Sequence, residues 1–250
     1  MLPSLAAVDW DESSPEVMRQ RAFAYEANIG PFEAMPFFIE ATQPGRTKVS
    51  FTVGKSCSFS CRVAEYYELV VGANYDDWEC WHSGNEVSYD LQQWQRLYIV
   101  AGMFDGENNK NVSFSSLRAV NADAFEEERT VDVGGNVHSV LERDFVNQTV
   151  NSIPSGFNFF QMFQGCKAIK SASRLLIDIG STQYVGGWSS TAMCCRMFDG
   201  CTSMETGPVI SLRSSIPFGE SCLDGMFSGC TSLAYAPGLQ VWIYGYGLSN

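Results

Sequence analysis

Two stretches of the sequence contain residue types that could bind a metal ion. Cys57 and Cys61 are separated by three residues, and Cys80 and His82 follow further along with one residue between them. Thiolate sulfur and imidazole nitrogen are the ligands of tetrahedral zinc sites, so the four side chains could form one if the two segments were adjacent. The spacing does not match a common zinc ribbon or finger. A Cys57–Cys61 disulfide is a second alternative, but we favour free buried thiols and predict no metal or other cofactor.

The sequence contains no motif typical of an enzyme active site. Neither a G-x-S-x-G element, a phosphate-binding loop, a dinucleotide-binding glycine motif nor an H-E-x-x-H pair is present. The second of the two histidines, His138, is expected to be packed or solvated. We therefore predict that the protein is not an enzyme.

Composition and charge narrow the classes of partner. The 250 residues are 45% hydrophobic and 18% charged, which is sufficient for a packed core, and the formal net charge is −12. An acidic surface repels a phosphate backbone, so nucleic acid is not an expected partner. No run of apolar residues is long enough to span a membrane, and the segment up to Asp9 does not resemble a secretory signal. The expected partners are other protein subunits, with a host-surface protein or glycan as a further possibility.

Three near-copies of one phrase dominate the second half of the chain. They read QMFQGCKAIKSASR from Gln161, RMFDGCTSMETGPV from Arg196 and GMFSGCTSLAYAPG from Gly225. A unit of this size cannot bury its own apolar face, so successive units are expected to stack. The side chains predicted to form one continuous core ladder are Met162, Phe163, Ile169, Met197, Phe198, Met204, Met226, Phe227 and Leu233. The cysteines Cys166, Cys201 and Cys230 are expected to pack as small apolar side chains, and Gly165, Gly200 and Gly229 to supply a tight turn.

These phrases resemble the BspA-like leucine-rich repeat, whose units read roughly M-F-x-G-C-T-S-L-x-x-A-P. Residues 66–102 are similar to a small β-module that commonly precedes such repeats, and residues 134–145 resemble the connector between the two. The resemblance implies a solenoid with one strand and one short helix per repeat. It also implies a role in adhesion or assembly, on the surface of anaerobic gut bacteria or in the structural proteins of their phages. It carries no catalytic residues.

We thus predict a mainly β protein with three parts. Residues 1–31 form an N-terminal helical anchor segment, because Ser13 or Ser14 can cap a helix and Pro15 suits its first turn. Residues 32–133 form a small β-sandwich- or barrel-like domain, with strands expected at 36–41, 47–53, 66–72, 76–84, 85–91 and 95–102. Residues 134–250 form the leucine-rich-repeat solenoid.

Two functions fit this organisation. The first is a structural component of a phage virion, such as a head or tail fibre, a decoration protein or an adaptor, present in a multi-copy assembly. The alternative is an adhesin on the bacterial cell surface that binds host matrix or glycans through its repeats. Aromatic side chains dominate binding surfaces, so the candidate contacts are Trp188, Trp242, Tyr244 and Tyr246, unless they cap the last repeat or enter the core.

Overall fold

The computed structural model describes residues 35–65, 75–102, 109, 112–124, 127–141, 159–179, 193–214 and 221–243. These residues form a mainly β protein, which confirms the coarse fold class. The strands are β1 (Phe37–Ala41), β2 (Thr47–Thr52), β3 (Ser58–Glu65), β4 (Glu79–His82), β5 (Glu86–Leu91), β6 (Gln95–Ala101), β7 (Arg118–Asn121), β8 (Val131–Asn136), β9 (Ile169–Ile179), β10 (Val209–Ser214) and β11 (Gly238–Ile243). Two 3₁₀ turns, Tyr75–Asp77 and Val137–Val140, complete the described elements. The predicted helix over 1–31 and the predicted strand over 66–72 lie outside the described residues.

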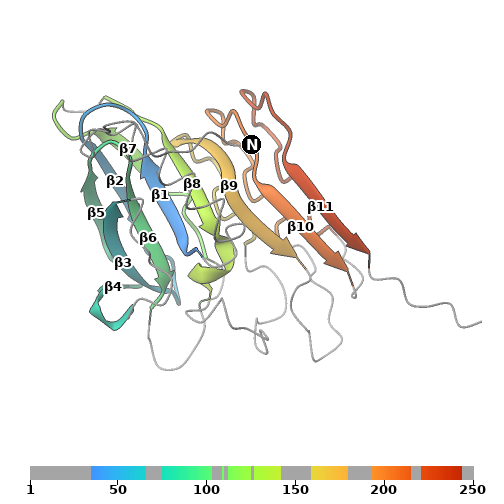
Figure 1. Cartoon of the computed structure of the whole chain (residues 1–250), viewed down its shortest axis with the longest axis horizontal. Helices are drawn as coiled ribbons and strands as arrows, with labels where there is room; N and C mark the ends of the chain where they lie inside the picture. Colours follow the sequence, from blue (N-terminus) through green and yellow to red (C-terminus); the bar gives the residue numbers. More distant parts are fainter. Residues whose placement is uncertain are drawn as a thin grey trace, which may run out of the picture.

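One mixed sheet runs through most of the molecule. Its eight strands lie in the order β11-β10-β9-β8-β1-β6-β3-β4. Figure 1 shows five of them, β1, β8, β9, β10 and β11, side by side in this order. Pairing is antiparallel from β4 to β8 and parallel from β8 to β11. The sheet therefore changes from antiparallel to parallel pairing at β8, the strand that contains the predicted domain boundary between residues 133 and 134.

A second sheet of three antiparallel strands, β5-β2-β7, shares its apolar core with the larger sheet. Strand β2 alternates buried and exposed residues along most of its length, with Val49 and Phe51 buried, as expected for a strand with one face on the core. The ring of Phe51 lies edge-on to that of Phe114, whose other neighbours include Phe37 of the larger sheet. Aromatic contacts thus connect the two sheets.

The repeats do not form the separate solenoid that we expected. Each contributes one parallel strand, and these strands β9, β10 and β11 extend the same sheet that contains β1 and β6. One apolar core likewise includes buried residues from both halves, from Phe37 to Met226. The physical reason is that β8 pairs with β1 on one edge and with β9 on the other, so the hydrogen-bonded ladder is not interrupted between the parts.

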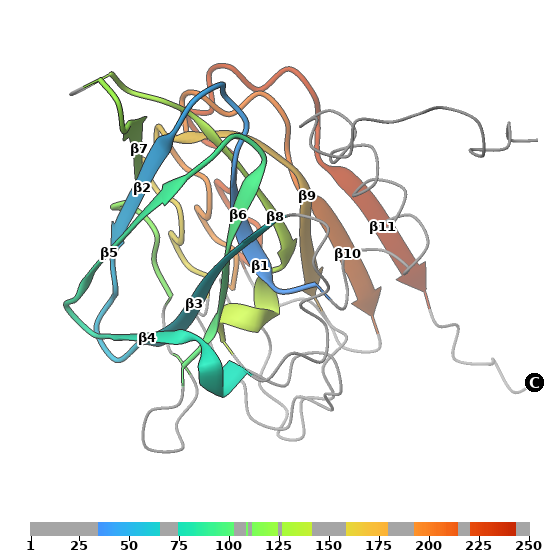
Figure 2. The same ribbon diagram turned by 60° about the vertical axis from the view of Figure 1, so that its left-hand side comes forward.

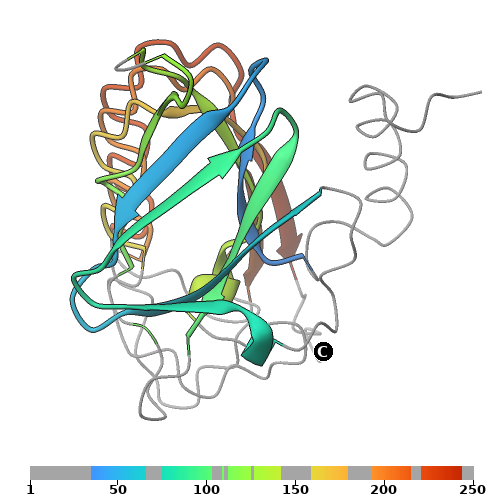
Figure 3. The ribbon, with the colours of Figure 1, turned by 90° about the vertical axis from the view of Figure 1, so that its left-hand side faces the viewer.

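Each repeat forms what we call a layer, a turn segment followed by a strand. Layer 1 is residues 159–179, layer 2 is 193–214 and layer 3 is 221–243. Figure 3 shows the turn segments stacked on one side of the core, with the strands on the other.

The short helix predicted for each repeat is wrong. The turn segments contain consecutive i to i+3 hydrogen bonds, for example from Gln164 N–H to Gln161 C=O and from Cys166 N–H to Phe163 C=O. An α-helix requires an unbroken run of right-handed residues with i to i−4 bonds. Here Gln161 and Gly165 have φ of 55° and 72°, and the equivalent residues of the other layers are also left-handed. Left-handed residues at this spacing break the helix into separate turns.

The turn segments form a second ladder between layers. In layer 1, the N–H groups of every second residue donate to carbonyl groups of layer 2 over 2.7–3.1 Å. The pairs are Phe159 to Met193, Gln161 to Cys195, Phe163 to Met197 and Gly165 to Asp199. Layer 2 repeats the pattern toward layer 3, with Cys194 to Cys222, Arg196 to Asp224, Phe198 to Met226 and Gly200 to Ser228. Both sides of each layer are therefore hydrogen-bonded to the next, and all these N–H groups point the same way along the stack.

The predicted core ladder is confirmed. Its members in layers 1 and 2 are at most 3% exposed, as is Met226, whereas Phe227 and Leu233 of layer 3 are only partly buried. The phenylalanine rings stack in a column, with centroids 5.2 Å apart between Phe163 and Phe198 and 5.7 Å apart between Phe198 and Phe227. The column begins before the repeats, because Phe114 stacks on Phe163 at 5.8 Å and its N–H donates to Met162 C=O.

Candidate interaction surfaces

The four candidate metal ligands do not converge. In the pairing of β3 with β4, Cys61 lies opposite Glu79, whereas Cys80 lies opposite Ser60. Side chains of successive residues point to opposite faces of a strand, so Cys61 faces away from Cys80 and His82. Cys57 and Cys61 are buried, and Cys80 and His82 are exposed. Within the described residues, no three histidine, cysteine or acidic side chains lie close enough together to hold a metal ion.

The structure records all nine cysteines as free thiols, so it does not contain the Cys57–Cys61 disulfide. Burial raises the pKa of the Cys61 thiol well above its usual value, and the nearby Glu79 raises it further. Burial likewise raises the pKa of Cys166 to about 11. The repeat cysteines lie against carbonyl groups instead, with Cys201 Sγ 3.0 Å from Phe163 O and Cys230 Sγ 3.0 Å from Phe198 O. The repeat thiols pack as predicted and also form weak hydrogen bonds, which we did not predict. The expectation of buried free thiols holds for Cys57 and Cys61 but is wrong for Cys80, which is exposed.

Of the four aromatic residues proposed as contacts, the structure places only the backbone of Trp242. It lies in β11, paired with Arg213 of β10. The side chain of Trp242, and Trp188, Tyr244 and Tyr246 as a whole, lie outside the described residues.

A buried charge cluster joins the first part of the chain to layer 1. Arg96 of β6 donates from Nε to Glu40 of β1 over 2.9 Å, and Arg174 of β9 also donates to that carboxylate. Burial alone would raise the pKa of Glu40, but the charges and hydrogen bonds of Arg174 and Arg96 outweigh it and lower the pKa. The Arg96 guanidinium also lies 4.2 Å from the ring centroid of Phe38. Each charge has a partner, so the cluster holds the strands in register and offers no reactive group.

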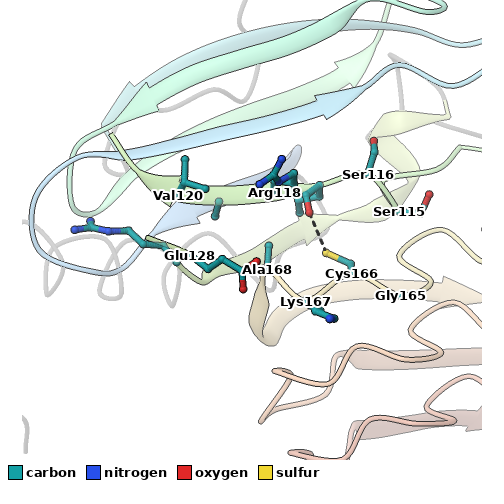
Figure 4. Close-up of a pocket in the computed structure, with 12 residues that line it drawn as sticks. Ser115, Ser116, Arg118, Val120, Glu128, Gly165, Cys166, Lys167 and Ala168 are labelled. Carbon is teal, nitrogen blue, oxygen red and sulfur yellow. Dashed lines mark hydrogen bonds between the residues drawn. The ribbon is translucent and has the colours of Figure 1, made fainter. Parts of the chain in front are cut away.

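A surface groove of about 360 Å³ lies between β7 and the turn segment of layer 1. Figure 4 shows Ser115, Ser116 and Arg118 on one side of it and Gly165, Cys166, Lys167 and Ala168 on the other. Three of its lining residues are cationic, namely Arg118, Lys167 and Arg129, and one, Glu128, is acidic. Such a lining suits a polar or anionic ligand.

The clearest unpaired surface is the outer face of layer 3. The large hydrophobic side chains that are exposed in the described part of the chain are Leu223, Tyr235 and Leu239, and all belong to this layer. Leu239 is 60% exposed, whereas Ile210, its partner in the β10–β11 register, is 3% exposed. The same side-chain position is therefore covered in layer 2 and uncovered in layer 3. Figure 2 shows β11 at the end of the sheet.

Comparison with known proteins adds no relative, since no family model, curated protein or solved structure matches the chain. The likeness to BspA-like repeats consequently stays a prediction from the sequence. Within the described ranges, no helical segment has the length and apolar character needed to cross a bilayer.

Proposed function

We propose that the protein is a non-enzymatic structural component of a phage virion that acts through protein–protein contacts. The observation that supports this most is the outer face of layer 3, where apolar side chains and a sheet edge are exposed together. Exposed apolar patches on folded proteins mark interaction sites, and unpaired sheet edges pair readily with other chains. The described surface offers recognition geometry of this kind.

We further propose that the three layers are BspA-like leucine-rich repeats in which a run of turns replaces the short helix. The shared Met-Phe-x-Gly-Cys phrase has the same structural role each time, which supports the assignment. Its glycines Gly165, Gly200 and Gly229 have φ between 71° and 75°, a conformation that side chains with a β-carbon resist. Its phenylalanines form the stacked column, and its cysteine thiols face carbonyl groups.

The proposal is tested on phage particles purified from the host that carries the gene. An antibody raised against the recombinant chain should label intact particles, and electron microscopy should place the chain at symmetry-related positions with layer 3 against a neighbouring subunit. A chain that is absent from purified particles and is recovered as a monomer would contradict the proposal.

The groove of Figure 4 favours the second candidate, a surface adhesin. Its three cationic side chains and the hydroxyl groups of Ser115 and Ser116 suit an acidic or sulfated glycan. Under this alternative, the recombinant chain should bind acidic glycans on an array, and replacing Arg118 and Lys167 with alanine should abolish the binding. The same substitutions should leave incorporation into a virion unchanged, which separates the two candidates.

A further inference from the structure

Within the described part of the chain, layer 3 has a row of backbone N–H donors without acceptors. In layers 1 and 2, alternate N–H groups of the turn segment donate to the following layer. The equivalent groups of layer 3 belong to Leu223, Gly225, Phe227 and Gly229, and none of them has a hydrogen-bond partner in the described part of the chain. These four N–H groups, which we call the donor row, alternate along the chain in the same way as the N–H groups that are hydrogen-bonded between layers.

The strand side of layer 3 is open in the same direction. Strand β11 pairs with β10 over six residue pairs, from Val209 with Gly238 to Ser214 with Ile243, and ends the sheet. Its second edge therefore presents backbone groups to a further strand. The donor row and the strand edge flank one surface, so a single added segment could pair with both.

The side chains between these two edges continue columns that are buried in layer 2. Phe227 is only partly buried, and its stacking partner Phe198 covers one face of its ring. Leu239 continues the column of Ile177 and Ile210, which are 0% and 3% exposed. An added segment that carries an aromatic ring over Phe227 and an aliphatic side chain over Leu239 would complete both columns.

Hydrogen-bond polarity decides what this segment is. A second copy related by a two-fold axis would set the donor row of one copy against the donor row of the other. A second copy stacked head to tail would need the carbonyl side of layer 1, but Phe114 already donates to Met162 C=O there. The partner must instead bring carbonyl groups that point back toward layer 3.

We propose that layer 3 binds a separate protein, which adds a fourth layer to the stack. This added layer consists of a strand parallel to β11 and a turn segment whose carbonyl groups accept hydrogen bonds from the N–H groups of Leu223, Gly225, Phe227 and Gly229. The partner segment has the chemistry of the repeats themselves, with an aromatic residue at the turn and an apolar strand. This inference rests on the proposed function and specifies the contact through which the protein joins its assembly. Addition of a strand to a sheet edge is an established mode of peptide recognition.

The probe is a synthetic peptide with the sequence of residues 221–243, the segment that covers layer 2 in the chain itself. A fluorescent form of the peptide is titrated with the full-length protein under reducing conditions, and anisotropy gives the dissociation constant. Hydrogen exchange with mass spectrometry then locates the protected amides. We expect saturable binding with a dissociation constant below about 1 mM, and slower exchange at residues 223–229 and in β11.

A matched pair of variants identifies the surface. Leu239→Asp places a charge where the added layer would pack, and we expect it to weaken binding at least about tenfold. Ser88→Asp adds the same charge at an exposed position of β5, away from layer 3, and should leave the affinity unchanged. Leu239 is already largely exposed in the free protein, so both variants are expected to fold, and thermal unfolding checks this.

Four results would overturn the inference, and three of them come from the peptide experiments. These three are the absence of saturable peptide binding, slowed hydrogen exchange only at amides outside layer 3, and equal affinity of the two variants for the peptide. Native mass spectrometry of the chain alone gives a fourth, because a dimer that protects the same amides would make a second copy the occupant. None of these measurements uses virions. The inference can thus fail while the chain is still found in particles, and a chain absent from particles can still bind the peptide.

Discussion

The stacked phenylalanine column provides a test of whether the outer face of layer 3 is uncovered in the free protein. Phe198 is 0% exposed, and its ring lies between those of Phe163 and Phe227. Truncating a buried phenylalanine to alanine costs about 3–5 kcal/mol in free energy of unfolding. Phe227 has one stacking neighbour in the described structure and is only partly buried, so Phe227→Ala should cost about half as much, roughly 1.5–2.5 kcal/mol.

Urea unfolding followed by tryptophan fluorescence measures both values, and an unchanged dependence on urea concentration shows that the unfolding reaction is the same in each variant. The wild type is the reference for each, and the two substitutions remove the same atoms. If Phe227→Ala costs as much as Phe198→Ala, the ring of Phe227 is covered on both sides in the free protein. The interpretation of layer 3 as an open end would then be refuted.

Three further outcomes follow from the described contacts. Gly135→Ala should destabilise the fold by at least about 2 kcal/mol more than Gly165→Ala in urea unfolding. Both residues have positive φ, but only at Gly135 would the added β-carbon clash with a carbonyl oxygen, that of Pro36. Equal free-energy costs for the two variants would refute this. Glu40→Gln should cost about 3–5 kcal/mol, because it removes the carboxylate charge that pairs with the buried Arg96 and leaves the partly buried Arg174 with its longer ion pair, to Asp132 at 3.7 Å. The pKa of Glu40 is lowered in the folded state, so its contribution to stability is present above about pH 4.5 and is lost as the pH falls through the folded pKa. The Glu40→Gln variant should therefore lose less stability in acid than the wild type. Parallel curves of unfolding free energy against pH for the two proteins would contradict this. Cys80 is the exposed thiol among the nine, so a thiol reagent should modify it first under native conditions, and Cys80→Ser should remove that fast phase; if the fast phase persists, another thiol is accessible.

The parts of the fold that could be predicted are those with strong periodicity. Alternation in residues 47–53 predicted β2, and the repeated Met-Phe-x-Gly-Cys phrase predicted which side chains of layers 1 and 2 are buried. The glycines of the phrase predicted a left-handed turn, which φ of 71° to 75° confirms. In each case one local rule determines the outcome.

Other elements depend on interactions that the local sequence does not reveal. The left-handed residues Gln161 and Arg196 carry β-carbons, so nothing in their type excludes the short helix that we predicted. Strand β3 was missed because both of its faces are partly buried. Ser58 and Ser60 are 2% and 3% exposed on the face opposite Phe59, which obscures the alternation of polar and apolar residues.

The candidate surfaces were only partly accessible to sequence reasoning. The pairing register between β3 and β4 separates Cys61 from Cys80, and register depends on contacts between segments that are distant in sequence. The start of the phenylalanine column could have been found, because Phe114 and Leu117 have the same spacing as Phe163 and Cys166. The donor row of layer 3 could not, since it becomes evident only when the hydrogen bonds of successive layers are compared.

The uniform direction of the turn ladder also bears on how the chain folds during synthesis. Layer 1 is laid down on Phe114 and β8, and each later layer pairs with the one that precedes it in sequence. Every such contact is made with residues that the ribosome has already released, so folding can keep pace with translation and needs no segment still to be made. A growing stack of this kind always ends in a template for the next segment, and layer 3 retains that template in the folded protein.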